Sequence, residues 1–249
     1  MDTIARAAHH IDCGKRREKI EWLNYWWSSA DADAPKRYLL IGDSISRQYR
    51  GKLESISGVP VDYIGTSSFV LDERFLKEIE TFFDLCVGGV KMYSGIQVQI
   101  GVHGILADGE ISSKENFYQI YKEQYRYLID YLLPRTDRLI LAGTTPAVEM
   151  GVKNRYLRYA LWKFYHPRWA ETLDKATDCE LRIRNKIAME LASEYHLSFN
   201  DLYSYMETEG RKFKHMDRLH YVRRADGFMA RRVLCYLEAE QGERTEQVF

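Results

Sequence analysis

Short apolar runs alternate with amphipathic stretches along most of this 249-residue chain. The apolar runs predict buried β-strands at residues 37–42, 61–64, 96–100 and 139–142, with a fifth near 197–202. Between these runs, apolar residues recur three and four positions apart, which predicts helices. The helices are expected after Ser44, after Asp72, across 117–132, near 180–195 and from Ala225 to Tyr236. Strands that alternate with helices predict a largely parallel, five-stranded sheet covered on both faces.

Two segments lie outside the alternating pattern. Residues 37–249 contain no linker, repeat or low-complexity tract and are expected to form one domain. The preceding residues, 1–36, include the aromatic run 20–27, which we interpret as a helix that packs on the main domain or on a second subunit. Residues 147–179 follow the fourth strand and are rich in aromatic and basic side chains. Ligand sites of open α/β sheets collect beyond the carboxyl ends of the strands, so this insertion is expected near the site.

The charge balance and hydropathy narrow the class of partner. Lys and Arg total 36, and Asp and Glu also total 36, so the formal net charge is zero. Without a global positive field, nucleic acid is not an expected partner. No stretch approaches the roughly 20 apolar residues that span a bilayer, which excludes a membrane span. The polar start, Met1 to Arg6, lacks the apolar centre of a secretory signal and predicts a cytoplasmic protein.

The cysteines do not form a recognisable metal-binding or disulfide pattern. They stand far apart in the chain, at Cys13, Cys86, Cys179 and Cys235. No CxxC pair and no clustered histidines accompany them, so we expect buried thiols and no structural metal.

Gly42, Asp43 and Ser44 follow the first strand, at the edge of the sheet where ligands bind. Ser44 is expected at the start of a helix, where unpaired N–H groups and the helix dipole stabilise an oxyanion. This position suits a nucleophile. A serine in this place also serves commonly as a helix N-cap, and the tripeptide alone leaves both interpretations open.

Asp217 and His220 lie between the fifth strand and the last helix. A carboxylate three residues before a histidine can hold one ring nitrogen while the other faces a serine. The two motifs together predict a Ser44, His220 and Asp217 relay.

The segments Leu40–Ser44 and Asp217–His220 resemble the first and last sequence blocks of the SGNH, or GDSL-type, hydrolases. The resemblance covers roughly residues 37–240 and implies a three-layer α/β/α, flavodoxin-like fold. It also implies Ser44 as nucleophile, His220 as general base and then general acid, and Asp217 as the residue that orients His220. The implied course is an acyl-serine intermediate, with no metal and no organic cofactor.

The middle blocks depart from the common family pattern. Where the family often has Gly-x-Asn-Asp, this chain has Gly101-Val102-His103-Gly104, so His103 is expected either as an oxyanion donor or as a structural histidine. The Gly-x-His form resembles a branch related to carbohydrate-linked esterases. The Ser44 N–H is a further implied donor, and the remaining donor is Gly65 by residue type or Ser68 by spacing.

Substrate contacts are expected from the insertion and from the segment before the last helix. Residues 151–170 carry five basic and no acidic side chains, and residues 211–224 carry six basic side chains and Asp217. We predict Trp162, Arg158 and Arg218 as substrate-binding residues and expect a preference for anionic substrates. The aromatic residues of 156–169 would stack on a sugar or enclose an acyl chain, unless they pack as a helix or subunit contact.

The sequence therefore predicts a serine esterase that removes a short acyl group from a carbohydrate or a similar small polar molecule. Two alternatives remain open at this stage. One is an O-acyltransferase that uses the same acyl-serine, and the other is a binding protein that keeps the fold but has lost a working oxyanion hole.

Overall fold

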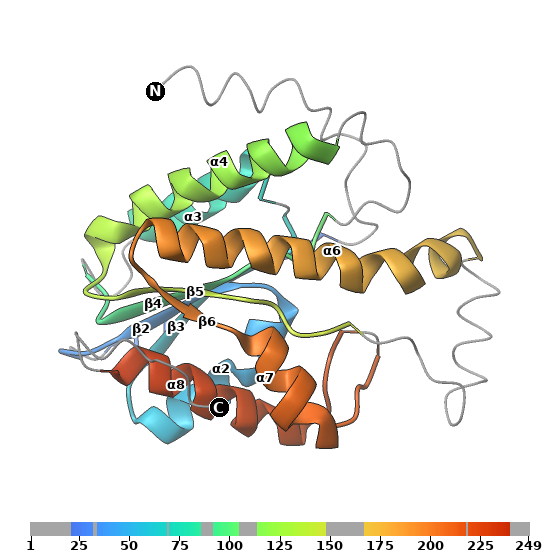
Figure 1. The fold of residues 1–249 in the computed structure, drawn as a ribbon. Coiled ribbons are helices and arrows are strands. Elements are labelled where there is room, and N and C mark those ends of the chain that lie inside the picture. Colours follow the sequence, from blue (N-terminus) through green and yellow to red (C-terminus); the bar gives the residue numbers. More distant parts are fainter. Residues whose placement is uncertain are drawn as a thin grey trace.

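The computed structural model describes residues 21–31, 34–68, 70–85, 92–104, 114–147, 167–217 and 219–239 (Figure 1). The strands are β1 (Leu23–Trp26), β2 (Tyr38–Gly42), β3 (Val61–Thr66), β4 (Gly95–Gln99), β5 (Leu139–Ala142) and β6 (Ser198–Asn200). The α-helices are α2 (Ser44–Ser57), α3 (Glu73–Leu85), α4 (Lys114–Leu132), α6 (Pro167–Glu194), α7 (Leu202–Thr208) and α8 (Asp226–Glu238). Three short 3-10 turns are η3 (Leu133–Arg135), η4 (Glu209–Lys212) and η5 (Arg223–Ala225).

The sheet has six strands in the order β1-β3-β2-β4-β5-β6. Strands β3, β2, β4, β5 and β6 pair in parallel, which confirms the predicted parallel sheet, whereas β1 pairs with β3 in antiparallel fashion. The order of the five parallel strands is the flavodoxin-like one, in which the chain reverses its direction of winding between β2 and β4. Ligands bind at this switch point in open α/β sheets, so the segments after β2 and β4 are the place to look for a site.

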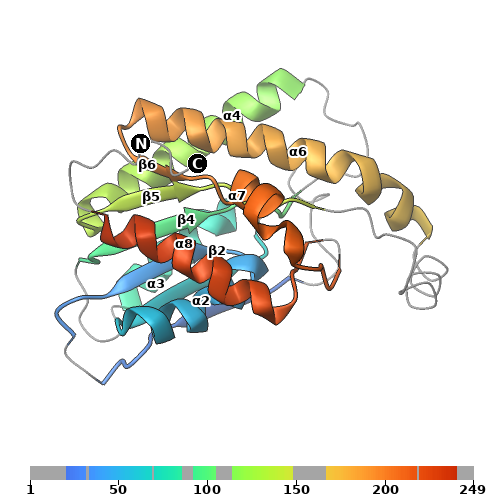
Figure 2. The same cartoon turned by 60° about the horizontal axis from the view of Figure 1, so that its bottom comes forward.

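Helices cover both faces of the sheet and bury the strands β2, β3, β4 and β5 completely. Helices α3, α4 and α6 lie on one face and α2, α7 and α8 on the other, and the turned view of Figure 2 agrees with this layering. Two hydrophobic cores correspond to the two faces. Along β2, Leu39 and Ile41 enter the core under α3 and α4, while Tyr38 and Leu40 enter the core under α2 and α8. This alternation is why the central strands are apolar at nearly every position.

The sixth strand corrects the prediction for the aromatic run 20–27. We expected a helix there, but Leu23–Trp26 form the edge strand β1. On one side of this strand, Tyr25 packs edge-to-face on Phe82 of α3, and Trp27 stacks on the same ring with 4.7 Å between centroids. A strand sends alternate side chains to opposite faces, and this segment carries large aromatics on both, which hides the period of two in the sequence.

The other side of β1 contacts α2 through two arginine–tryptophan stacks. The Arg47 guanidinium lies 4.7 Å from the Trp22 ring centroid, and that of Arg50 lies 4.5 Å from the Trp26 centroid. Each stack covers an indole face that would otherwise meet solvent at the sheet edge. The edge strand therefore binds to both helical layers.

The remaining expectations are either corrected by the structure or concern residues that it does not describe. Helix α6 begins at Pro167, so the last part of the 147–179 insertion belongs to a helix that we expected only near 180–195. Residues 148–166 and the first 20 residues lie outside the described part of the chain. Cys179 and Cys235 are free and exposed rather than buried. None of the helices in the described ranges combines the length and the apolar character that a membrane crossing requires.

Candidate active site

Ser44 follows β2 as the first residue of α2, and the turn around it is fixed by Asp43. The Asp43 carboxylate accepts a hydrogen bond of 2.8 Å from the Ile45 N–H, so Asp43, not Ser44, is the N-cap of α2. The Asp43 carbonyl accepts from the Tyr63 and Ser46 hydroxyls at 2.7 and 2.9 Å. Because another residue caps the helix, the Ser44 hydroxyl is available for other contacts.

Asp217 and His220 occupy a tight loop between η4 and η5. The loop is closed by an antiparallel bridge between His215 and Tyr221. Within it, the Asp217 Oδ1 accepts the backbone N–H groups of Leu219 and His220, both at 2.8 Å. The Asp217 Oδ2 lies 2.8 Å from the His220 Nδ1. One carboxylate thus shapes the loop and holds the imidazole in it.

The structure brings the three predicted residues into one hydrogen-bonded chain. The His220 Nε2 lies 2.6 Å from the Ser44 Oγ, although the two residues are 176 positions apart. With the Nδ1 proton donated to Asp217, Nε2 presents a lone pair that accepts from the Ser44 hydroxyl. Gln48, one turn into α2, donates to the Tyr221 carbonyl at 2.5 Å and ties the two segments together. This is the geometry that an activated serine requires.

The electrostatics of the pair follow from its hydrogen bonds. The hydrogen bond that His220 donates to Asp217 raises the pKa of His220, against the opposing effects of burial and of Arg47. For Asp217, burial favours the neutral acid, but the hydrogen bonds from His220 and Leu219 prevail and lower its pKa to about 2. Asp217 is therefore ionised across the neutral pH range, as the partner of an imidazole that gains a proton must be.

The predicted residue His103 lies in a loop after β4 that is bounded by two glycines with positive φ, Gly101 at 143° and Gly104 at 67°. Arg184 of α6, which is only 1% exposed, holds this loop through three backbone carbonyls. Its guanidinium donates to Gly101, His103 and Gly104 at 2.8, 2.6 and 3.0 Å. Glu180 accepts from the remaining nitrogen at 3.0 Å. A single buried cation thus fixes the backbone that carries His103.

Replacing Arg184 by methionine should lower the free energy of unfolding by about 3 kcal/mol, because three carbonyls and a carboxylate lose their donor. Urea denaturation measures the loss. Arg182→Met is the matched control: Arg182 lies on the same helix with two carboxylate partners, Asp178 and Glu207, but is 53% exposed. We expect it to cost less than about 1 kcal/mol. Equal losses in the two variants would contradict the role assigned to Arg184.

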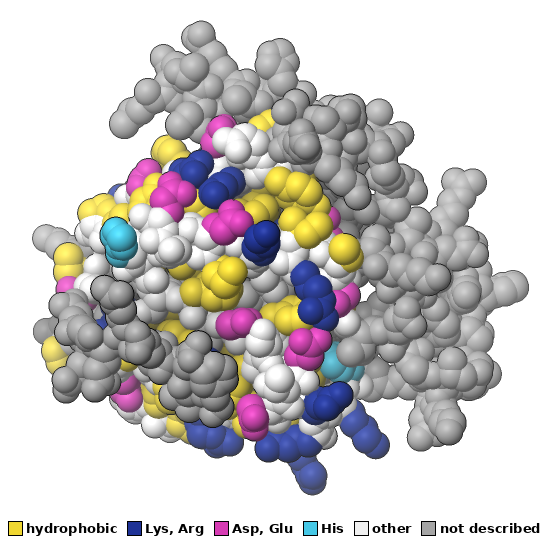
Figure 3. All heavy atoms as spheres, in the orientation of Figure 1, with side chains coloured by type: hydrophobic (Ala, Val, Ile, Leu, Met, Phe, Trp, Pro, Cys, Tyr) yellow, Lys and Arg dark blue, Asp and Glu magenta, His cyan; other side chains and the backbone are white. Residues whose placement is uncertain are grey.

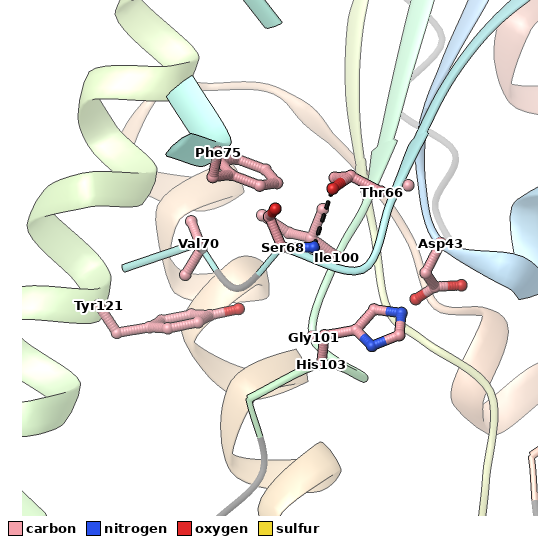
Figure 4. Close-up of a pocket in the computed structure, with 10 residues that line it drawn as sticks. Asp43, Thr66, Ser68, Val70, Phe75, Ile100, Gly101, His103 and Tyr121 are labelled. Carbon is pink, nitrogen blue, oxygen red and sulfur yellow. Dashed lines mark hydrogen bonds between the residues drawn. The ribbon is translucent and has the colours of Figure 1, made fainter. Parts of the chain in front are cut away.

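The loop after β3 contains the other two predicted oxyanion donors, and its polar groups already have partners. The Ser68 N–H donates to the Thr66 hydroxyl oxygen at 2.8 Å (Figure 4). The Thr66 and Ser68 hydroxyls donate to the Glu78 carboxylate of α3 at 2.7 and 2.8 Å. Gly65 is glycine for a steric reason, since a Cβ there would collide with the Tyr63 ring. The geometry therefore does not support Ser68 as a donor, and the role of Gly65 stays a prediction.

A small cavity with room for about one water molecule opens beside Asp43 and His103. It is lined by Gly42, Asp43, Thr66, Ser68, Val70, Phe75, Ile100, Gly101, His103 and Tyr121. Figure 4 shows the His103 imidazole and the Asp43 carboxylate near each other, with Val70, Phe75 and Tyr121 on the other side. Burial raises the pKa of Asp43, while His103 and the Ile45 N–H act in the opposite direction. The cavity thus has one polar and one apolar wall.

The predicted substrate-binding residues are not placed by the structure. Trp162, Arg158 and Arg218 lie outside the described residues. The described basic residues of the 211–224 segment are exposed, namely Arg211, Lys212, Lys214, Arg223 and Arg224. Lys and Arg side chains gather along the lower edge of the face in Figure 3, over α7 and α8. In the described ranges, no group of three or more His, Cys, Asp or Glu side chains could hold a metal ion.

Sequence reasoning missed four residues that shape the site: Asp43, Glu78, Arg184 and Arg47. Arg47 could have been identified from the sequence, because it stands three positions after Ser44 on a predicted helix and so lies on the same helix face. Arg184 and Glu78 act on loops far away in the sequence, and no local pattern signals such contacts.

Comparison with known proteins identifies the fold. No family model matches the sequence, and no protein of curated function matches it either. Among solved structures, the acetylxylan esterase Axe2 from Geobacillus stearothermophilus matches with 14% identity and a TM-score of 0.54, over 83% of this chain and 96% of that one. LAE5, an alpha/beta hydrolase enzyme from the Lake Arreo metagenome, matches with 12% identity and a TM-score of 0.55, over 83% and 96%. A lipase/acylhydrolase from Enterococcus faecalis matches with 15% identity and a TM-score of 0.52, over 80% and 93%.

These likenesses show that the chain shares the α/β/α fold of these three proteins. Three further Axe2 structures are of catalytic mutants, in which a serine, an aspartate or a histidine is replaced by alanine. In Axe2 the replaced aspartate precedes the replaced histidine by three positions. Asp217 and His220 have the same spacing.

Proposed function

We propose that this protein is a serine esterase of the SGNH type, which removes a short acyl group, above all acetyl, from a hydroxyl of a carbohydrate or a similar small polar molecule. The observation that carries the proposal is the hydrogen-bonded chain from Ser44 through His220 to Asp217. The fold shared with an acetylxylan esterase and the matching Asp–His spacing support it.

The proposed reaction has two halves that use the same imidazole. In the first, the Ser44 Oγ attacks the ester carbonyl carbon while His220 Nε2 takes the hydroxyl proton. His220 then gives this proton to the leaving alkoxide, which departs as the alcohol and leaves an acyl-serine. In the second half, His220 takes a proton from water as the water attacks the acyl-serine, and returns it to Ser44 as the carboxylic acid leaves. Asp217 keeps the imidazole oriented and stabilises its cation.

The negative oxygen that forms in each half needs nearby donors. The Ser44 N–H lies at the N-terminus of α2, where N–H groups lack acceptors within the helix and the dipole is positive. We assign His103 as the side-chain donor from the opposite loop, in the place where related sequences carry an asparagine. Arg184 holds the backbone of the His103 loop and is thus a positioning residue. Gly65 remains the expected third contributor.

The size of the cavity beside Asp43 favours a short acyl chain. Its free space is about that of one water molecule, which also suits a methyl group. Val70, Phe75 and Ile100 supply an apolar lining for that methyl. A long acyl chain would have to displace these packed side chains, so acetyl is the acyl group that we propose.

Hydrolysis of 4-nitrophenyl acetate should rise with pH and reach half its maximum above pH 6.5, because only neutral His220 accepts the serine proton. The hydrogen bond that His220 donates to Asp217 raises the pKa of His220 above its ordinary value, so protonation removes the base at a higher pH than for a free imidazole. A kcat/KM profile from pH 5 to 9 measures this. A flat profile would argue against His220 as the base.

The proposed function is tested by labelling the folded protein with a fluorophosphonate, which reacts with activated serines, and mapping the modified peptide by mass spectrometry. We expect a single adduct on Ser44 and none on heat-unfolded protein. In parallel, acetate release from acetylated xylo-oligosaccharides and 4-nitrophenyl acetate is measured. Absence of both labelling and hydrolysis would overturn the enzyme proposal in favour of a binding protein.

A further inference from the structure

Arg47 lies at the entrance to the proposed site, on the same face of α2 as Ser44. The two residues are three positions apart in the helix, a spacing that places side chains next to each other. The Arg47 side chain is exposed, and its charge reaches the catalytic base, since it lowers the pKa of His220 against the larger effect of Asp217. A cation therefore lies close to the Ser44–His220 pair.

The Arg47 side chain is held in place by Trp22. Its guanidinium lies 4.7 Å from the centroid of the Trp22 ring. Trp22 is fixed in turn by Ser67, whose Oγ accepts from the Trp22 N–H at 2.8 Å and whose N–H donates to the Trp22 carbonyl at 3.0 Å. The Trp22 ring also meets His103 edge-to-face, with 6.2 Å between centroids. Trp22 thus holds the exposed guanidinium of Arg47 near the loop that carries His103.

The Arg47 guanidinium makes no ion pair with the described part of the chain. The described residues give it no ion pair and no side-chain hydrogen bond, and its backbone N–H donates to the Asp43 carbonyl. Arg50, one turn further along α2, offers a contrast. It stacks on Trp26 in the same way, but it pairs with Glu54 at 3.7 Å and donates to the Val61 carbonyl at 3.3 Å. Of the two stacked arginines, only the one beside Ser44 keeps its donors for a ligand.

We propose that Arg47, held by Trp22, binds a carboxylate of the substrate next to the ester that Ser44 attacks. The inference rests on the proposed function and names the substrate class: acetyl esters that carry a carboxylate on the alcohol part. A planar guanidinium that presents two parallel N–H donors matches a carboxylate better than any other side chain does. Arg47 lies outside the two basic segments, 151–170 and 211–224, on which the expected anionic preference was based.

The test compares an anionic ester with its neutral methyl ester, namely 4-acetoxybenzoate and methyl 4-acetoxybenzoate. For both esters, kcat/KM is measured at low salt for the wild type, Arg47→Gln and Arg50→Gln. The two esters are assayed on the same protein sample, so a folding defect cancels from their ratio.

The ratio of anionic to neutral kcat/KM should fall about tenfold in Arg47→Gln, as expected for the loss of a charge-assisted hydrogen bond. The same ratio should stay within about twofold of wild type in Arg50→Gln, since that arginine already has its carboxylate. About 0.5 M salt should lower the wild-type ratio.

An unchanged ratio in Arg47→Gln would overturn the assignment, as would an equal fall in Arg50→Gln. These results differ from a failure of the proposed function, in which the wild type would hydrolyse neither the neutral nor the anionic esters.

Discussion

Ser44→Ala should lower kcat for 4-nitrophenyl acetate by at least about 10⁴-fold, because Ser44 carries the hydroxyl that, among the described residues, hydrogen-bonds to the His220 Nε2. The His220 Nε2 would face a methyl group in the variant, and the residual rate would come from binding and the oxyanion donors alone. The measurement is the rate of 4-nitrophenyl acetate hydrolysis at saturating substrate, and formation of the fluorophosphonate adduct is followed on the same protein. Both signals should disappear together.

Ser57→Ala provides the control for this loss. Ser57 lies at the opposite end of the same helix, α2, where its hydroxyl donates to the carbonyls of Glu54 and Val59. Its removal should change kcat by less than about twofold, since surface substitutions away from the site have small effects. If Ser44→Ala hydrolysed the ester as fast as Ser57→Ala, another nucleophile would have to be sought.

Asp217→Asn should lower kcat by about 10⁴-fold while leaving the fold intact. An asparagine oxygen can still accept the N–H groups of Leu219 and His220, so the loop keeps its shape. Its amide, however, donates to the His220 Nδ1 in place of accepting from it. The ring proton then moves to Nε2, and the imidazole presents a donor to Ser44 where it must present an acceptor.

The pH profile adds a second readout to this substitution. The hydrogen bond to Asp217 is the largest effect that raises the pKa of His220, so the residual activity of Asp217→Asn should fall at lower pH than in the wild type. Asp217 also contributes to the free energy of unfolding, because folding lowers its pKa to about 2. This contribution is fully present above about pH 4 and is lost as the pH falls from there through about 2.

Asp201→Asn is the matched control for the loss of an aspartate charge. Asp201 caps α7 by accepting from the Ser204 N–H at 2.9 Å, and asparagine caps equally well. We expect activity within about twofold of wild type. Near-equal activity of Asp217→Asn and Asp201→Asn would remove Asp217 from the mechanism.

The parallel sheet and the meeting of Ser44, His220 and Asp217 could be predicted because their signals are local. Apolar runs of strand length alternate with periodic stretches, and the two short motifs occupy turns at the same edge of the sheet. The edge strand could not be predicted in this way. Its large side chains pack on Phe82 on one side and stack on arginines on the other, so no polar face marks the alternation.

The surroundings of the site were less accessible to sequence reasoning than its reacting atoms. The His103 loop depends on Arg184, which is more than 80 positions away and stands among other arginines of the same helix. Ser68 matched the expected spacing for an oxyanion donor, but Thr66, two residues earlier, accepts its N–H. Whether the Ser68 N–H donates to Thr66 or to an oxyanion depends on the Thr66 side-chain rotamer, and sequence spacing carries no information on rotamers.

The 176 positions that separate Ser44 from His220 also bear on how this protein reaches its working state. The nucleophile and its helix belong to the first parallel βα unit, whereas the base comes just before α8, the last described helix, which packs on α2. Contacts between such distant parts of a chain form slowly, because a long loop must close first. During synthesis Ser44 therefore precedes His220 by most of the chain, and the proposed hydrolysis would begin only after α8 has packed on α2. The proposed activity would thus depend on the completion of folding.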